Sequence, residues 1–313
     1  MTRKITGGLR ALTAAAALLG GVAARAELAP AKAPEAAAPA PERKIAWTPG
    51  PATVTLGDAL AEVRLPEGLA FAGAEDTRRL LEEMGNSTDG SEMGLIVPKA
   101  EDQSWFIVFE WSDVGYVKDD EKDAIDADAL LASMKEGTEA ANAWRKERGL
   151  PALHVVGWSE PPRYDERTHN LTWATLGRND EGHESVNYNV RVLGREGVMS
   201  VTFVDDPKNL AAARPAVDGV IAAFGYKQGK TYAEWVPGDK VAEYGLTALV
   251  AAGAGAAAAK LGFFGFLAKI FAKAGKLIVL GLAALGAAAA KFWSALRGKA
   301  PARRAAGPGP GPA

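Results

Sequence analysis

The stretch from Leu246 to Ala268 constrains this chain most, because its only charged residue is Lys260. About 20 helical residues cross the roughly 30 Å apolar core of a bilayer. Lys260 lies toward the carboxyl end of the stretch, where a long side chain can reach the lipid headgroups. The lysines that follow, Lys269, Lys273 and Lys276, are typical of the cytoplasmic side of a membrane segment. The stretch therefore predicts an anchor that enters the membrane from outside and ends in the cytoplasm.

A second apolar run, from Leu277 to Ala290, leaves two arrangements open. As a second crossing it would complete a transmembrane helical hairpin, which its apolar residues favour. As a surface helix it would keep the basic tail inside, which agrees with the usual charge distribution. On the strength of the apolar residues, we favour two membrane helices. Small residues recur four apart at Ala252 and Ala256 and at Gly286 and Ala290, a spacing that suits close helix packing. A soluble alanine-rich hairpin is the remaining alternative.

The two ends of the chain differ in composition from its middle. Residues 1–26 join three basic residues to a short apolar run that closes on Ala24-Arg25-Ala26, the pattern of a secretory signal peptide. We expect cleavage after Ala26, with an uncleaved signal anchor as the alternative. Residues 27–46 are rich in Ala and Pro, and a tract of this composition forms a linker rather than a core. The predicted organisation is a signal peptide at 1–26, a linker at 27–46, a folded periplasmic domain at 47–240, a membrane anchor at 241–298 and a disordered tail at 299–313.

Composition excludes several classes of function. The chain has 36 Lys and Arg residues against 38 Asp and Glu residues, so it lacks the basic field of a nucleic-acid-binding protein. It has no Cys, which removes thiol nucleophiles, thiolate metal sites and disulfides. It also lacks a phosphate-cradling glycine loop, a G-x-S-x-G elbow and an H-E-x-x-H motif. We therefore expect no cofactor, no nucleic-acid partner and no catalytic group.

The middle of the chain alternates short apolar runs with turn residues. In SWFIVFEWSD, the side chains at 105, 107, 109 and 111 share one face while those at 106 and 108 lie on the other, which predicts a strand covered on both sides. Helices are expected over 74–84, from Asp126 or Asp128 to Gly149, and over 211–224. The runs LHVVGW, LTWATL, VNYNVRVL and VMSVTFV predict antiparallel strands, the last three joined by hairpins. The order predicts an α+β fold with one antiparallel sheet and flanking helices, similar to the small PsbP/Mog1 sandwiches.

An acidic loop raises the question of a calcium site. Asp119, Glu121 and Asp123 alternate as calcium ligands do. Ile125 and Asp126 stand where a turning glycine and further ligands are needed, so a solvated loop before an acid-capped helix is favoured.

The three histidines, His154, His169 and His183, could also hold a metal ion. The hairpin interpretation places His169 and His183 at opposite ends of two paired strands, about 20 Å apart. We therefore predict no metal site.

The stretch GWSEPPRYD is the most distinctive one and supplies the candidate binding residues. Pro161-Pro162 predicts a stiff extended loop between two strands that carries Trp158, Arg163, Tyr164 and Asp165. Arg163 could pair with Asp165 or stack on Tyr164 or Trp158. A structural corner, in which the aromatic rings pack and the arginine satisfies carbonyl groups, is the favoured interpretation. A preorganised recognition loop for a peptide, a glycan or a protein partner is the functional alternative.

Several blocks together resemble one protein family. GYVKDD, IDADALL, VVGWSEPPRYD, VNYNVRVLGREGVMS and GDKVAEYGL occur in this order and are similar to the DUF2167 family of bacterial envelope proteins, over about residues 47–293. The resemblance implies a membrane-anchored protein of unknown function. It supplies no catalytic residue, cofactor or ligand.

These observations predict a protein of the bacterial inner membrane whose main domain is periplasmic. The expected role is non-catalytic binding or scaffolding. The expected partners are the lipid bilayer and an envelope protein or a second copy, reached through the anchor helices. Two alternatives remain open: a subunit of a membrane complex or transporter, and a hydrolase that acts on envelope polymers.

Overall fold

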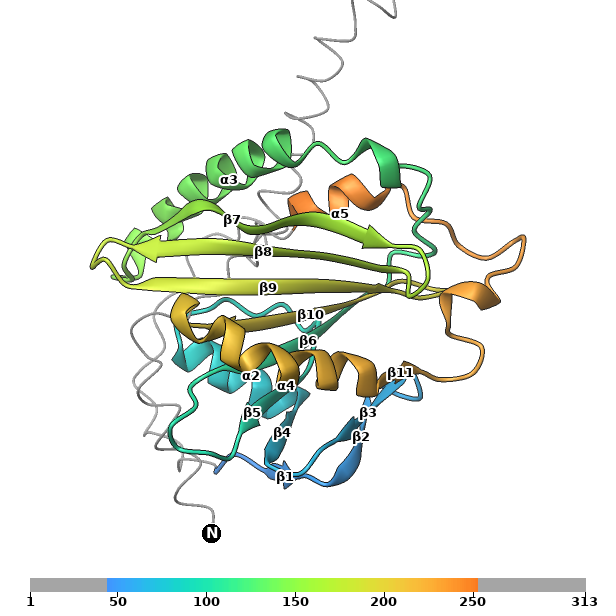
Figure 1. The fold of residues 1–313 in the computed structure, drawn as a ribbon, viewed down its shortest axis with the longest axis horizontal. Helices are drawn as coiled ribbons and strands as arrows, with labels where there is room; N and C mark the ends of the chain where they lie inside the picture. Colours follow the sequence, from blue (N-terminus) through green and yellow to red (C-terminus); the bar gives the residue numbers. More distant parts are fainter. Residues whose placement is uncertain (1–43, 253–313) are drawn as a thin grey trace, which may run out of the picture. The chain divides into compact units, whose positions relative to one another are not determined.

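The computed structural model describes residues 44–252, which form an α+β domain built on a large antiparallel sheet (Figure 1). The 8-stranded sheet has the order β1-β4-β5-β6-β10-β9-β8-β7, and every neighbouring pair in it is antiparallel. Its strands are β1 (Trp47–Pro49), β4 (Leu69–Gly73), β5 (Glu92–Pro98), β6 (Phe106–Ser112), β7 (Leu153–Asp165), β8 (Asn170–Asn179), β9 (Glu184–Leu193) and β10 (Val198–Asp205). The predicted strands and hairpins from β8 to β10 are therefore confirmed.

The expectation of one sheet is wrong, because three short strands form a second sheet. They pair in the order β11-β3-β2 and comprise β2 (Ala52–Leu56), β3 (Ala61–Leu65) and β11 (Phe224–Tyr226). Val54, Leu56 and Val63 point into the core against the large sheet. The second sheet exists because β11, which follows the last long helix, pairs with β3 far upstream, a long-range contact that local patterns do not reveal.

Four helices of the described residues pack around the sheets. They are α2 (Ala74–Glu83), α3 (Ala127–Glu147), α4 (Leu210–Ala223) and α5 (Leu246–Ala252), with 3₁₀ turns at Lys122–Ala124, Pro207–Asn209 and Tyr232–Glu234. Asp126 caps α3 as predicted, because its side chain accepts a hydrogen bond from the Ala129 amide at 2.9 Å. Gly149 adopts a φ of +66° just beyond the end of α3, the left-handed conformation that favours glycine.

The large sheet carries apolar clusters on both faces, so it forms the middle layer of the domain. One face packs against α4 and the small sheet, and β6 contributes Ile107 and Phe109 to that cluster. On the other face, β6 contributes Phe106 and Val108 to a cluster under α2. The two-sided pattern predicted for SWFIVFEWSD is therefore confirmed.

The stiff loop predicted for GWSEPPRYD is wrong, because the whole stretch belongs to strand β7. This strand is 13 residues long and lies at one edge of the large sheet (Figure 1). An edge strand tolerates proline, since one row of its amide groups needs no partner strand. The pairing with β8 is irregular between Glu160 and Arg163, where the two prolines lie. Proline has no backbone N–H, and a β-bulge at this point accommodates the missing ladder hydrogen bonds.

The packed part of the chain continues past the predicted boundary at residue 240. In helix α5, Leu246, Leu249 and Val250 are buried in a cluster with α3 and strand β8. These residues begin the stretch that was predicted to insert into the membrane. In the structure they are part of the hydrophobic core of the domain. Within residues 44–252, no helix is long and apolar enough to cross a membrane. The rest of the predicted anchor, the predicted signal peptide and the tail lie outside the described residues.

Candidate functional site

The four residues singled out in β7 do not form one surface. Tyr164 pairs with Leu171 and Trp158 pairs with Thr175, which places both aromatic rings on the face that α3 covers. Arg163 pairs with Thr172 on the opposite face and is exposed. Directly opposed residues in a sheet share a face, so the alternation along β7 separates Arg163 from the aromatic rings.

Both aromatic side chains make internal hydrogen bonds. The Trp158 indole nitrogen donates to the Ala127 carbonyl at 3.0 Å, at the start of α3. The Tyr164 hydroxyl donates to Asp119 at 2.9 Å and lies 3.0 Å from Nδ1 of His169. Burial, together with the hydrogen bond to Asp119, raises the pKa of Tyr164. These contacts fix the acidic loop and α3 to the sheet, which is a structural role.

Asp165 and Arg163 differ in what holds them. Asp165 accepts hydrogen bonds from the amides of Arg167 at 2.9 Å and Thr168 at 3.4 Å, so it closes the turn between β7 and β8. The hydrogen bond from the Arg167 amide is the main reason that the pKa of Asp165 is lowered. Within residues 44–252, the Arg163 side chain makes no hydrogen bond or ion pair, so neither the predicted pairing with Asp165 nor the carbonyl brace is present.

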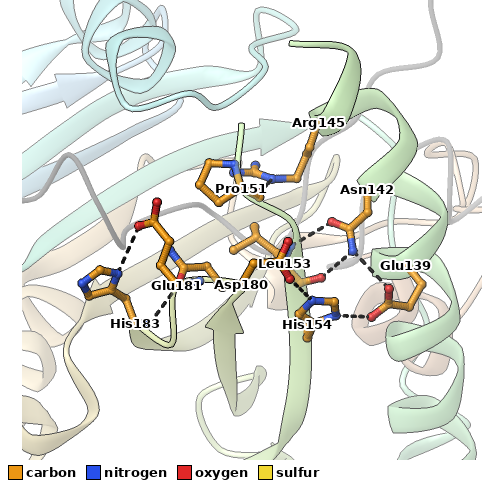
Figure 2. A network of polar contacts seen from close by, with 10 residues as sticks. Glu139, Asn142, Arg145, Pro151, Leu153, His154, Asp180, Glu181 and His183 are labelled. Atoms are coloured by element: carbon orange, nitrogen blue, oxygen red, sulfur yellow. Dashed lines mark hydrogen bonds and ion pairs between the residues drawn. The ribbon is translucent and has the colours of Figure 1, made fainter. Parts of the chain in front are cut away.

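The three histidines lie apart. His154 bridges two carboxylates, with Nδ1 2.6 Å from Glu139 on α3 and Nε2 2.9 Å from Asp180 in the β8–β9 turn (Figure 2). These two hydrogen bonds, the one to Asp180 first, raise the pKa of His154. His183 lies 3.4 Å from Glu181 in the same turn, whereas His169 precedes the other end of β8.

No metal centre is found among residues 44–252, in which no group of three or more His, Asp and Glu side chains is arranged to hold an ion. The acidic loop makes other contacts instead. Asp119 accepts from Tyr164, Lys122 pairs with Glu166 at 2.8 Å, and Glu121 accepts from the Thr247 amide at 3.2 Å.

A buried group of polar side chains on the large sheet was not found from the sequence. They share the face that carries α2, α3 and α5, and we call them the polar strip: Glu92, Glu110, Thr175, Asn187, Asn189, Arg191, Ser200 and Thr202. All but Glu110 are at most 8% exposed, and Glu110 is half-buried. Apolar clusters border the strip on two sides, one under α3 and α5 and the other under α2.

Part of the polar strip is satisfied within the domain. Glu92 accepts hydrogen bonds from the amides of Asp89 and Gly90, both at 3.0 Å. Asn189 donates to the Asn187 carbonyl at 3.0 Å and accepts from the Thr202 hydroxyl at 3.3 Å. The side chains of Glu92, Asn189 and Thr202 therefore have structural roles.

Other polar atoms in and beside the strip have no hydrogen-bond partner in the described part of the chain. They are Nη1 of Arg191, both side-chain polar atoms of Asn187, the Thr175 hydroxyl and the indole nitrogen of Trp173. Arg191 is 8% exposed, Asn187 is 1% exposed, and Thr175 and Trp173 are fully buried. Native proteins pair nearly all such groups, so unpaired groups concentrated on two neighbouring strands are the most unusual feature of the domain.

Two ionisable groups of the strip have shifted pKa values. Burial raises the pKa of Glu110 to about 7, although the Arg191 charge opposes the shift and the Glu92 charge adds to it. Burial lowers the pKa of Arg191 to about 10, against the opposing effect of Glu110. In the ladder, Ser200 lies between them and is directly opposite both. Arg191 therefore stays charged at neutral pH, whereas Glu110 titrates there.

Fold and site together define a small α+β domain with a polar strip buried on one face of its large sheet. The model of the DUF2167 family, proteins of unknown function, matches residues 48–286. The chain therefore belongs to the DUF2167 family.

No curated protein matches the chain. Among solved structures, the chain is similar to cyanobacterial PsbP (CyanoP) from Synechocystis sp. PCC 6803, with 8% sequence identity and a TM-score of 0.36. The similarity covers 56% of this chain and 91% of the PsbP chain.

Proposed function

We propose that this chain is a membrane-anchored protein of the bacterial cell envelope whose domain binds a ligand without transforming it. One observation supports binding: unpaired polar atoms are buried together at Trp173, Thr175, Asn187 and Arg191. A buried polar group without a partner costs about 1–3 kcal/mol. A ligand that supplies the missing partners offsets that cost in the bound state.

The anchor and the location rest on the sequence. Residues 1–26 have the pattern of a secretory signal, and the apolar residues that follow α5 lead into the cluster Lys269, Lys273 and Lys276. This pattern supports a periplasmic domain held at the inner membrane. The lipid bilayer is then one partner. Contacts through the anchor helices, with an envelope protein or a second copy, are the other.

The binding role is tested by asking what the purified protein carries. The full-length chain is purified in mild detergent and denatured, and the released small molecules are identified by mass spectrometry. Thr175→Val removes one unpaired hydroxyl with little change of shape. Thr172→Val is the matched control, because Thr172 lies on the same strand but on the opposite face.

Two results separate binding from a purely structural strip. The proposal predicts a compound that is released from the wild type and Thr172→Val and is depleted in Thr175→Val. Release of nothing, or equal release from all three proteins, would contradict a binding role for the strip.

A hydrolase that acts on envelope polymers is the second candidate, and Glu110 is the observation that favours it. A carboxyl group with a pKa of about 7 is suited to general acid–base chemistry at neutral pH. Release of soluble fragments from cell-wall polymer by the wild type, and not by Glu110→Gln, would favour the hydrolase. Absence of fragments with both proteins would favour binding alone.

A further inference from the structure

The unpaired groups form two rows along neighbouring strands. Thr175 is directly opposite Asn187, and Trp173 is opposite Asn189. Arg191 lies four residues beyond Asn187 on β9, which corresponds to about 13 Å along an extended strand. The unpaired atoms therefore extend along the strand direction. The Asn187 amide and the Thr175 hydroxyl lie at one end, and the Arg191 guanidinium lies at the other.

The guanidinium end is the most unusual chemically. Arg191 is 8% exposed, and its Nη1 has no hydrogen-bond partner within residues 44–252. Its Cζ lies 4.8 Å from the centroid of the Trp173 ring, which attracts the cation but accepts no conventional hydrogen bond. The nearest acid in the strip, Glu110, is two strands away, or about 10 Å. The positive charge of Arg191 is thus buried without a directly bonded counter-charge, which is costly unless an anion pairs with it.

The balance of hydrogen-bond donors and acceptors among the unpaired groups also indicates an anionic ligand. Arg191 and the Trp173 indole can only donate hydrogen bonds, whereas Asn187 and Thr175 can donate or accept. None of the four groups is acceptor-only. A ligand that satisfies them must therefore present acceptor oxygens at the Arg191 and Trp173 end, and carboxylate and phosphate oxygens match a guanidinium best.

Building on the proposed binding function, we propose that the polar strip binds a small linear molecule with a carboxylate or phosphate group at Arg191 and hydroxyl or amide groups at Thr175 and Asn187. Apolar clusters border the strip on two sides, so the rest of the ligand lies between apolar surfaces. Such surroundings strengthen the pairing of an oxyanion with Arg191, because water competes less well there.

The experiment measures ligand-induced stabilisation of the full-length protein in detergent. The probes are succinate and inorganic phosphate, with succinamide as the neutral analogue of succinate. Melting temperatures are recorded over a concentration series at constant ionic strength. Arg191→Met removes the charge, and Arg191→Lys keeps the charge but lacks the paired N–H donors of the planar guanidinium. Arg163→Met is the matched control, because Arg163 is an exposed arginine on the same sheet.

The proposal predicts a saturable rise of the melting temperature with succinate or phosphate and none with succinamide. Arg191→Met should weaken binding at least tenfold, Arg191→Lys should weaken it less, and Arg163→Met should leave it unchanged. A dicarboxylate-type ligand is indicated if succinate binds more tightly, and a phosphorylated one if phosphate does.

Other outcomes overturn the inference in distinguishable ways. Equal stabilisation of Arg191→Met and the wild type would show non-specific anion binding. Stabilisation by succinamide that Thr175→Val removes would refute the oxyanion while retaining the binding function. No response of the wild type to any probe would refute the oxyanion site. If Arg191→Met fails to fold, Arg191→Lys decides: weaker binding of succinate or phosphate with an intact melting transition supports the site, and binding equal to that of the wild type refutes it.

Discussion

The guanidinium carbon of Arg191 lies 4.8 Å from the centre of the Trp173 ring, and both side chains are buried on neighbouring strands. The ring satisfies part of the electrostatic need of the cation and leaves Nη1 unpaired. The Trp173 indole nitrogen is unpaired as well. This pair of residues therefore provides two donors that the described part of the domain does not use.

Stability should depend on pH through Glu110. Its pKa is about 7 in the folded protein, above its ordinary value of 4.5, so the folded state holds its proton more tightly than the unfolded state does. The resulting contribution is present at low pH and is lost as the pH rises from about 4.5 to about 7. Glu110→Gln should reduce this loss by roughly 1–3 kcal/mol. Urea unfolding at pH 5 and pH 8 measures it, and an unchanged pH dependence in the variant would refute it.

His154 should stabilise the domain at acidic pH. Hydrogen bonds to Asp180 and Glu139 raise its pKa, so the contribution is complete below the unfolded pKa of about 6.5 and is lost as the pH rises through the folded value. The side chain is 43% exposed, so solvent screening limits the effect to less than about 1 kcal/mol.

The measurement compares melting temperatures of His154→Gln and the wild type at pH 5.5 and pH 9. The variant should be less stable at pH 5.5, and the difference should shrink at pH 9. His183→Gln is the matched control, because His183 faces one carboxylate, Glu181, rather than two. A difference that grows with pH would contradict the assigned ion pairs.

Substitutions of the candidate residues in β7 should differ in their effect on the free energy of unfolding. Trp158→Phe removes the hydrogen bond to the Ala127 carbonyl and should lower the free energy of unfolding by about 1 kcal/mol. Arg163→Ala should change it by less than about 0.5 kcal/mol, because the side chain is exposed. Urea unfolding of the two variants measures both values. A larger loss for Arg163→Ala than for Trp158→Phe would reverse these roles.

Topology is tested with single cysteines, which this Cys-free chain permits. Arg167→Cys lies in the exposed turn after β7, and Lys273→Cys lies in the lysine cluster. A membrane-impermeant maleimide applied to intact spheroplasts should label the first and not the second. Labelling of both positions, or of neither, is incompatible with a periplasmic domain and a cytoplasmic lysine cluster.

Local signals predicted much of the fold. The cap at Asp126 and the left-handed Gly149 mark the ends of α3, and the short turns of β8, β9 and β10 specify their hairpins. These features depend on residues close together in sequence. The small sheet and the edge position of β7 depend on distant pairing, so the proline pair in β7 was mistaken for a loop. The PsbP/Mog1 similarity and the membrane anchor stay predictions.

The polar strip shows why the candidate site was missed. In VNYNVRVL, Asn187, Asn189 and Arg191 alternate with apolar residues, the pattern of a strand with one face in water. The alternation places these three side chains on one face of the strand. Its burial depends on segments that pack there from elsewhere in the chain, which no local pattern contains. Polar alternation in a central strand therefore leaves a solvated face and a buried binding site equally compatible with the sequence.

The central claim is that the unpaired polar groups of the strip and of Trp173 serve to bind a ligand and do not stabilise the fold. Thr175→Val tests it most directly, because valine has nearly the shape of threonine and lacks the unpaired hydroxyl. The measurement is the free energy of urea unfolding of the ligand-free full-length protein, with Thr172→Val as the control. The account predicts that Thr175→Val is as stable as the wild type or more stable, by up to about 1–3 kcal/mol. A loss of about 1 kcal/mol or more would show that the hydroxyl is already paired, and would contradict the claim.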